Sequence, residues 1–72
     1  MIQIFHYGGY RVHSHGNGAA YTLEAGGSET FIPYGDDAAI FRDRFNTCDA
    51  IDDPEHAINC KCGLIADYVL YR

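Results

Sequence analysis

Residues 10–25, YRVHSHGNGAAYTLEA, hold an Asn-Gly pair between two runs of β-prone residues. Asn-Gly accepts the positive φ angles of a tight type I′ turn, so it predicts a β-hairpin with a two-residue loop. That loop fixes the register, which places Val12 and Leu23 on an apolar face and His13 and His15 together on the polar face. The predicted cross-strand pairs are Arg11 with Glu24, Val12 with Leu23, His13 with Thr22 and Ser14 with Tyr21.

Segments on both sides of this hairpin are also typical of strands. Residues 1–7, MIQIFHY, end at a Gly-Gly pair, and residues 29–34, ETFIPY, follow the turn AGGS. Pro33 lacks a backbone donor, so we expect it to close its strand or to lie at a sheet edge.

The register of the second hairpin depends on the length of its loop. A two-residue loop at residues 26–27 would place Glu24 opposite Glu29, and like charges directly opposite each other are destabilising. We therefore expect a longer, bulged loop that pairs Leu23 with Phe31.

After residue 35 the apolar residues recur with a helical period. Asp36 is the expected N-cap, and Asp37 complements the dipole at the helix start. One narrow face of the predicted helix, residues 36–48, carries the apolar residues that a sheet would cover, namely Ala38, Phe41, Phe45 and Cys48. Cys48 is thus expected to be a small buried hydrophobe.

A second helix start follows, with Asp53 as cap, Pro54 at the first helical position and Gly63 placed to end the helix. Beyond it, residues 64–72, LIADYVLYR, are apolar and β-prone, and we expect them to form the last strand of the sheet. The sequence therefore predicts one α+β domain over residues 1–72. An antiparallel sheet of about four strands, hairpins first and the last strand C-terminal, packs against one main helix (about 36–48) and a short second helix (about 54–62).

The composition is that of a small acidic domain. Its 72 residues include five Lys and Arg against ten Asp and Glu, for a net charge of −5. Phosphate contacts need clustered basic side chains, so we expect no direct binding to nucleic acid. The start lacks the features of a secretory signal, and no stretch is long enough to span a membrane. We expect a cytoplasmic protein without membrane association, either monomer or homodimer, with its three cysteines reduced because an odd number cannot pair completely.

Two histidines and two cysteines raise the possibility of a metal-binding or thiol-redox module. His13 and His15 share a strand face, but Cys60 and Cys62 fall inside the predicted second helix, where residues two apart point in different directions. The spacing lacks the C-x-x-C pairs that strongly indicate zinc or thiol-disulfide exchange. We expect no metal and no cofactor, and keep His13, His15, Cys60 and Cys62 as the alternative site.

Catalysis needs a nucleophile, an oriented base and a pocket. Ser14, the local candidate beside His13 and His15, is predicted to point to the opposite face of the hairpin. We therefore expect no enzymatic activity.

Acidic residues are concentrated in one part of the sequence. Seven of the ten acidic residues lie between positions 36 and 55, against only Arg42 and Arg44. Ile40 lies off the apolar face among these acids, so it is either covered by the second helix or the apolar anchor of a binding surface. The predicted partner-binding residues are Asp36, Asp37, Ile40, Asp43, Asp49, Asp52, Asp53 and Glu55. If that surface is not used, the next candidate is the sheet around Tyr7, Tyr10 and Tyr34.

In length, acidity and compactness the chain resembles the small inhibitors encoded by phages and other mobile elements, among them anti-CRISPR proteins. The resemblance is one of class and rests on no motif, so it assigns no site residue. It implies a protein that blocks the basic, nucleic-acid-binding surface of a host protein or nucleoprotein complex by presenting carboxylates. A solvated acidic helix on a structural domain is the alternative interpretation of the same residues.

Overall fold

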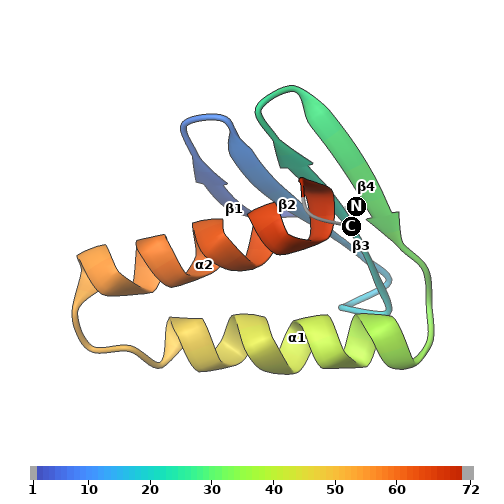
Figure 1. Ribbon diagram of the computed structural model, residues 1–72. Coiled ribbons are helices and arrows are strands. Elements are labelled where there is room, and N and C mark those ends of the chain that lie inside the picture. The colour runs from blue at the N-terminus through green and yellow to red at the C-terminus, as the bar shows by residue number, and fades with distance from the viewer. Residues whose placement is uncertain (1, 71–72) are drawn as a thin grey trace.

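The computed structural model describes residues 2–70 and contains a four-stranded sheet followed by two helices (Figure 1). The strands pair antiparallel in sequence order, so each one lies beside its neighbours in the chain. The predicted α+β fold is confirmed. The elements are β1 (Ile2–Tyr7), β2 (Tyr10–His15), β3 (Ala20–Ala25), β4 (Ser28–Ile32), α1 (Asp36–Asp49) and α2 (Pro54–Val69).

The register predicted for the β2–β3 hairpin is confirmed, because Val12 pairs with Leu23 and the other three predicted pairs also form. At the turn, Asn17 has a φ of 58° and Gly18 a φ of 91°. Both lie in the left-handed region that a type I′ turn requires. The strand pairing ends at His15 and Ala20, however, and Gly16 also has a positive φ, 56°, so the loop spans residues 16–19 rather than the predicted two residues. Val12 and Leu23 have no exposed surface.

The register expected for the β3–β4 hairpin is wrong. Glu24 pairs with Glu29 across a two-residue loop, and Leu23 pairs with Thr30 rather than with Phe31. In this register Ile32 enters the core at 1% exposure, whereas the two carboxylates lie on the water-facing side. Burial of Ile32 outweighs a repulsion that water screens. Pro33 directly follows β4, at a sheet edge, as predicted.

Helix α1 buries the face that its sequence predicts: Ala38, Phe41, Phe45 and Cys48 are all buried. The expected capping role of Asp36 is wrong, because Gly35 occupies the N-cap and Asp36 is the first helical residue. At a φ of 139°, Gly35 adopts a conformation open to glycine at little cost, and no side chain caps the helix. The carboxylates of Asp36 and Asp37 still interact favourably with the positive end of the helix dipole.

Helix α2 begins as predicted but does not end at Gly63. Asp53 is the N-cap, its carboxylate accepts from the backbone N–H of Glu55 at 3.0 Å, and the helix runs on to Val69. The predicted final strand is therefore wrong for residues 64–69, and residues 71–72 lie outside the described part. Leu64, Ile65 and Tyr68 recur at helical spacing and pack on the core, which outweighs the cost of about 1 kcal/mol for a glycine inside a helix.

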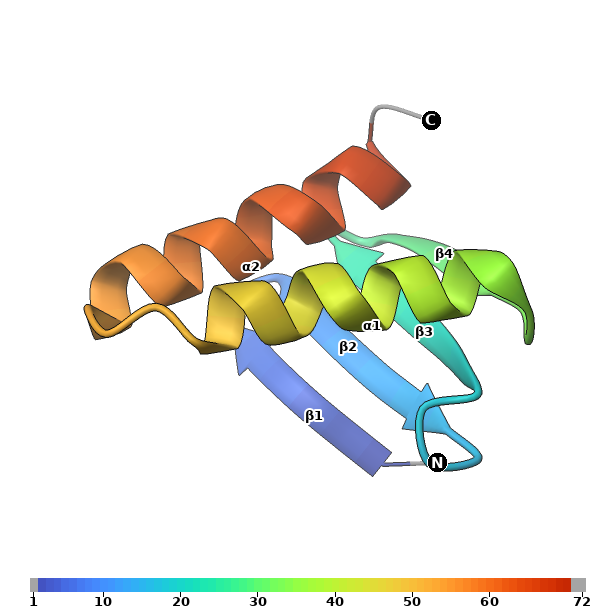
Figure 2. The same ribbon diagram turned by 90° about the horizontal axis from the view of Figure 1, so that it is seen from below.

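Both helices cover the same face of the sheet (Figure 2). They run antiparallel and side by side, and α2 lies closest to β3. The buried cluster joins side chains of β2, β3, β4, α1 and α2. Within the described residues no helix is long and apolar enough to cross a membrane.

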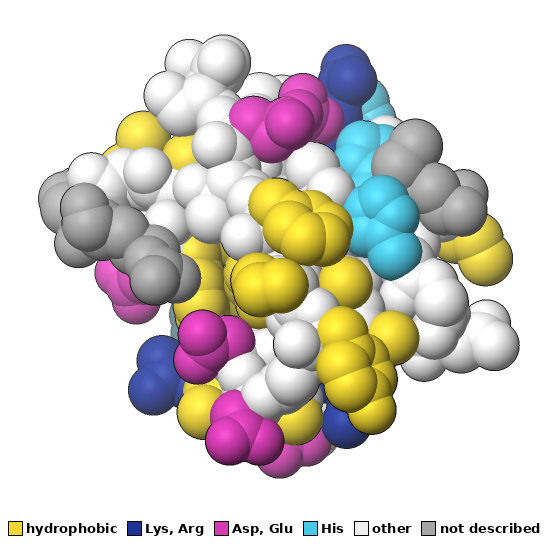
Figure 3. All heavy atoms as spheres, turned by 90° about the vertical axis from the view of Figure 1, so that its right-hand side faces the viewer, with side chains coloured by type: hydrophobic (Ala, Val, Ile, Leu, Met, Phe, Trp, Pro, Cys, Tyr) yellow, Lys and Arg dark blue, Asp and Glu magenta, His cyan; other side chains and the backbone are white. Residues whose placement is uncertain are grey.

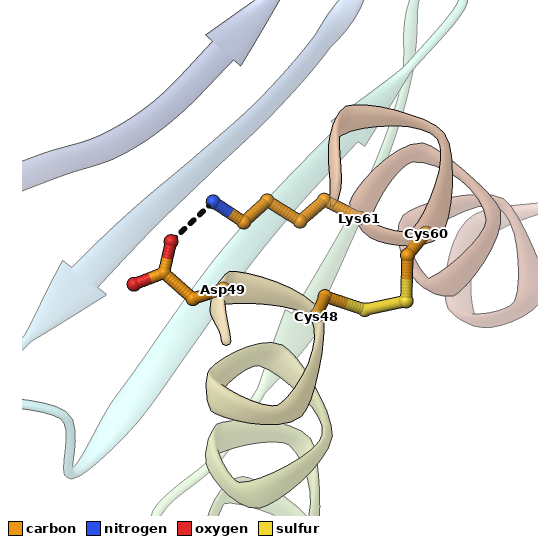
Figure 4. Close-up of polar contacts among 4 residues, drawn as sticks. All are labelled: Cys48, Asp49, Cys60 and Lys61. Carbon is orange, nitrogen blue, oxygen red and sulfur yellow. Dashed lines mark hydrogen bonds and ion pairs between the residues drawn. A yellow bond between two sulfur atoms is a disulfide. The ribbon is translucent and has the colours of Figure 1, made fainter. Parts of the chain in front are cut away.

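A disulfide and an ion pair tie the two helices together next to the turn that joins them (Figure 4). Cys48 of α1 is bonded to Cys60 of α2, and the Nζ atom of Lys61 lies 2.7 Å from Oδ1 of Asp49. The expectation that all three cysteines are thiols is wrong for this pair, and Cys62 alone is free. Cys48 is buried, as predicted, but as half of a crosslink.

We predict that reducing the disulfide lowers the free energy of unfolding by about 3 kcal/mol, because the bridge closes a short loop in the unfolded chain. The sequence separation of its cysteines is 12. Urea unfolding with and without reductant measures the change, and Cys62→Ser, which removes only the free thiol, should leave both curves in place. Equal stability with and without reductant would contradict the prediction.

Candidate functional site

All eight residues of the predicted partner-binding set are exposed, so none belongs to the core. They divide into two groups because α1 is about 21 Å long at 1.5 Å per residue. One group surrounds Ile40 in the first half of α1, and the other lies where α1 meets the turn to α2. The structure does not bring the eight together as a single patch.

Ile40 lies at the centre of the first group. Its neighbours on the helix surface, three and four residues away, are Asp36, Asp37, Asp43 and Arg44. The side chain is 48% exposed, so the second helix does not cover it. We call Asp36, Asp37, Ile40 and Asp43 the Ile40 surface. Acidic and hydrophobic side chains lie side by side on the part of the molecule where α1 begins (Figure 3).

The second group is partly engaged in holding the fold. Asp49 binds Lys61, and Asp53 caps α2 and lies 3.7 Å from the ring of His56. Asp52 and Glu55 are exposed on either side of this cap. A side chain already paired within the chain has less charge to offer a partner, so the Ile40 surface is the stronger candidate.

The two arginines of α1 have different roles. Arg42 donates from Nη1 to the carbonyl oxygen of Gly18 at 3.1 Å, which ties α1 to the β2–β3 turn. Arg44 lies beside Ile40 on the helix surface and makes no hydrogen bond or ion pair among the described residues. The Ile40 surface is therefore acidic with one adjacent, unpaired cation.

A groove between the two helices begins at this arginine. Its volume is about 430 Å³, and two of its lining residues, Cys48 and Leu64, are buried. A Cβ atom at Gly63 would meet no other atom within 4 Å, so the glycine leaves one wall open. The lining residues are Arg44, Thr47, Cys48, Cys60, Gly63, Leu64 and Asp67.

The alternative His and Cys site does not assemble. His13 and His15 alternate with the buried Val12 and so lie on the outer face of the sheet, whereas α2 carries Cys60 and Cys62 on the opposite side. Among residues 2–70, no three His, Cys, Asp or Glu side chains come close enough together to hold a metal ion.

Both histidines are half-buried rather than largely exposed, which differs from the expectation for a polar sheet face. The Nε2 atom of His15 lies 2.8 Å from the Thr22 hydroxyl, and its ring meets the Phe31 ring edge-on at 5.9 Å. The ring is thus partly covered by the next two strands. Its contacts are those of a structural side chain on the outer face.

Cys62 is a poor candidate for thiol chemistry. Burial raises the pKa of its thiol, so the reactive thiolate is scarcer than in an exposed cysteine at neutral pH. Its neighbour Cys60 is already bonded to Cys48.

The three tyrosines of the second candidate surface do not gather. Tyr7 pairs with Tyr10 at one end of the β1–β2 hairpin. Tyr34 follows β4 and lies at the other end of the sheet, because β4 begins beside the end of β3 that pairs with Tyr10. Tyr34 is 83% exposed and lies close to Asp36, with which it lines a small hollow beside α1.

Sequence reasoning missed the link between Cys48 and Cys60 and the pairing of Asp49 with Lys61. A signal was present, since both pairs join the end of α1 to the first half of α2 across a short turn. Antiparallel helices joined by such a turn bring these positions together.

Comparisons of the chain with models of known protein families, with curated proteins and with solved structures found no match.

We predict that the purified protein carries no stoichiometric zinc and that EDTA leaves its melting temperature unchanged. Metal bound only to the native state would stabilise that state, so its removal would lower the melting temperature. Elemental analysis and thermal unfolding followed by circular dichroism test this. A loss of several degrees with the chelator, reversed by added zinc, would revive a His or Cys metal site.

Proposed function

We propose that this protein is a small interaction module that docks the Ile40 surface onto a basic surface of a partner protein or nucleoprotein complex. The observation that carries the proposal is the exposed Ile40 with three carboxylates as its helix neighbours. Binding surfaces commonly combine an apolar anchor with a polar rim that excludes water. The exposed part of this side chain gains hydrophobic stabilisation only when a partner covers it.

The groove supplies a second contact next to the first. Arg44 borders both the Ile40 surface and the groove, so a partner segment that covers Ile40 can continue between α1 and α2. The groove floor is apolar, and Asp67 stands on the α2 side. A partner with a basic groove and a protruding apolar side chain fits this combination.

The class resemblance to phage-encoded inhibitors suggests what such docking achieves. Carboxylates placed on a nucleic-acid-binding surface occupy the sites of phosphates, and the host protein, such as a CRISPR complex, is thereby blocked. The proposed location is the cytoplasm of the host cell. In that reducing compartment Cys48 and Cys60 would be thiols, and the two helices would then rely on the Lys61–Asp49 pair and the shared core.

The first test reverses the charge of the Ile40 surface. Asp36, Asp37 and Asp43 are changed together to Lys, and the wild-type protein and the variant are immobilised to capture partners from host lysate. We expect the variant to lose a partner that the wild type retains, because electrostatic steering and the acidic rim are both removed. Asp49 is left unchanged because it pairs with Lys61.

A matched control uses the opposite side of the molecule. Glu24→Lys with Glu29→Lys also removes acidic charge, but from the outer face of the sheet, and it should retain the partner. For the captured partner, affinity should fall steeply as salt rises. The wild type and the sheet variant should both displace its bound nucleic acid, whereas the α1 variant should not. Retention by the α1 variant together with loss by the sheet variant would place the binding surface on the sheet.

The second test removes the apolar anchor alone. Ile40→Ala should weaken binding of the captured partner about tenfold or more, as expected for a central interface residue. It should leave the melting temperature nearly unchanged, because Ile40 is exposed and alanine favours helices. Leu70→Ala, which shortens a side chain of similar exposure (50%), is the matched control. Titration calorimetry and thermal unfolding separate the two effects, and an unaltered affinity would remove Ile40 from the interface.

A further inference from the structure

Strand β1 is apolar but buries almost nothing. Five of its six residues are exposed, and only Phe5 is half-buried, where it packs against Phe45. Ile2, Ile4 and Tyr7 are 63%, 42% and 55% exposed, which places three large hydrophobic side chains on one edge strand. A strand of this composition is normally covered on at least one side.

The two edges of the sheet differ in how they are protected. Strand β4 carries Glu29 and is followed at once by Pro33. A charged side chain and a proline commonly prevent an edge strand from pairing with another chain. Strand β1 has neither, and residues 2–10 contain no Asp, Glu, Lys or Arg. A bulge at Ile4 interrupts the pairing of β1 with β2, yet the outward backbone groups of the edge strand remain open to another chain.

We propose that the β1 edge is the interface of a homodimer, in which β1 of one copy pairs antiparallel with β1 of a second copy. The absence of charged side chains on this edge favours a second copy of the chain as its partner. A two-fold interface pairs the edge strand with a copy of itself, residue i facing residue j and j facing i, so an edge with charges of one sign would repel its copy, whereas an uncharged edge is self-compatible. In a protein of net charge −5, residues 2–10 form an uncharged stretch at a sheet edge.

The resulting dimer is one continuous eight-stranded sheet. A two-fold axis perpendicular to the sheet leaves both helical layers on the same side. The Nζ atom of Lys61 lies 5.6 Å from the ring centroid of Phe5 and 2.7 Å from Oδ1 of Asp49, so the end of α1, where the acidic turn begins, lies near the new interface. Salt should therefore strengthen this association by screening the repulsion between two acidic copies, which is opposite to its effect on binding to a basic partner.

Sedimentation velocity over a range of protein concentrations tests the proposal. As protein concentration rises, the mass of the wild type should increase from 8.0 kDa to twice that value. The protein concentration at the midpoint of this change should fall when salt is raised. Ile2→Lys should weaken the dimer about tenfold or more, because each dimer receives two like charges at its interface. Phe31→Lys, at 58% exposure on the β4 edge strand, is the matched control and should dimerise as the wild type does.

Hydrogen exchange of the wild-type protein is a second test, which does not depend on any variant. Backbone amides of residues 2–7 should exchange more slowly at high protein concentration, while those of β4 should not change. A wild type that stays at 8.0 kDa throughout, or a Phe31→Lys variant that loses the dimer as Ile2→Lys does, would overturn the proposal. A mass that continues to grow beyond two copies would also overturn it, in favour of head-to-tail pairing of β1 with β4.

Discussion

The side chain of Phe41 is where the sheet and both helices meet. It has no exposed surface, and its ring lies 4.8 Å from Tyr21 of β3, 5.8 Å from Phe45 of α1 and 5.5 Å from Tyr68 of α2. Burying a phenylalanine contributes several kcal/mol, which is a large part of the stability of so small a domain. The positions of α1 and α2 on the sheet follow from filling the space around this ring.

The same helix separates stability from recognition. Phe41 and the other buried residues of α1 lie on one face, and the Ile40 surface lies on another, although Ile40 and Phe41 are adjacent in sequence. Consecutive residues of a helix point about 100° apart, so neighbours in the chain can serve different purposes. Changes to the carboxylates around Ile40 can therefore alter partner choice while the core stays intact.

How well the sequence predicted each part depended on the range of the interactions involved. The β2–β3 register was predictable because the Asn17-Gly18 turn encodes it locally. The β3–β4 register was not, because it depended on weighing the Glu24–Glu29 repulsion against burial of Ile32, and only the folded sheet shows how far water screens the charges. The second half of α2 was misread because a short apolar run has a similar composition in a helix and in a strand, and the packing of Leu64 and Ile65 decides between them.

The candidate site shows the same division. Exposure of the acids on α1 and the buried face of that helix follow from helical period alone, and both were predicted. The pairing of Asp49 with Lys61, like the Cys48–Cys60 bond, depends on where α2 lies, and a prediction that ended α2 at Gly63 could not supply it. The helical period of the apolar residues determines which face of one helix is buried. A contact between two helices depends in addition on where each helix lies.

The order of the elements along the chain also has a consequence for biosynthesis. A ribosome releases the complete four-stranded meander first, with Val12 and Leu23 on a face that nothing yet covers. Pairing between strands that are consecutive in sequence is fast, but Leu64 and Ile65, which cover that face, emerge only after a whole helix and a turn. Until α2 leaves the exit tunnel, the nascent sheet therefore exposes a hydrophobic face that is prone to aggregation and open to binding by a chaperone.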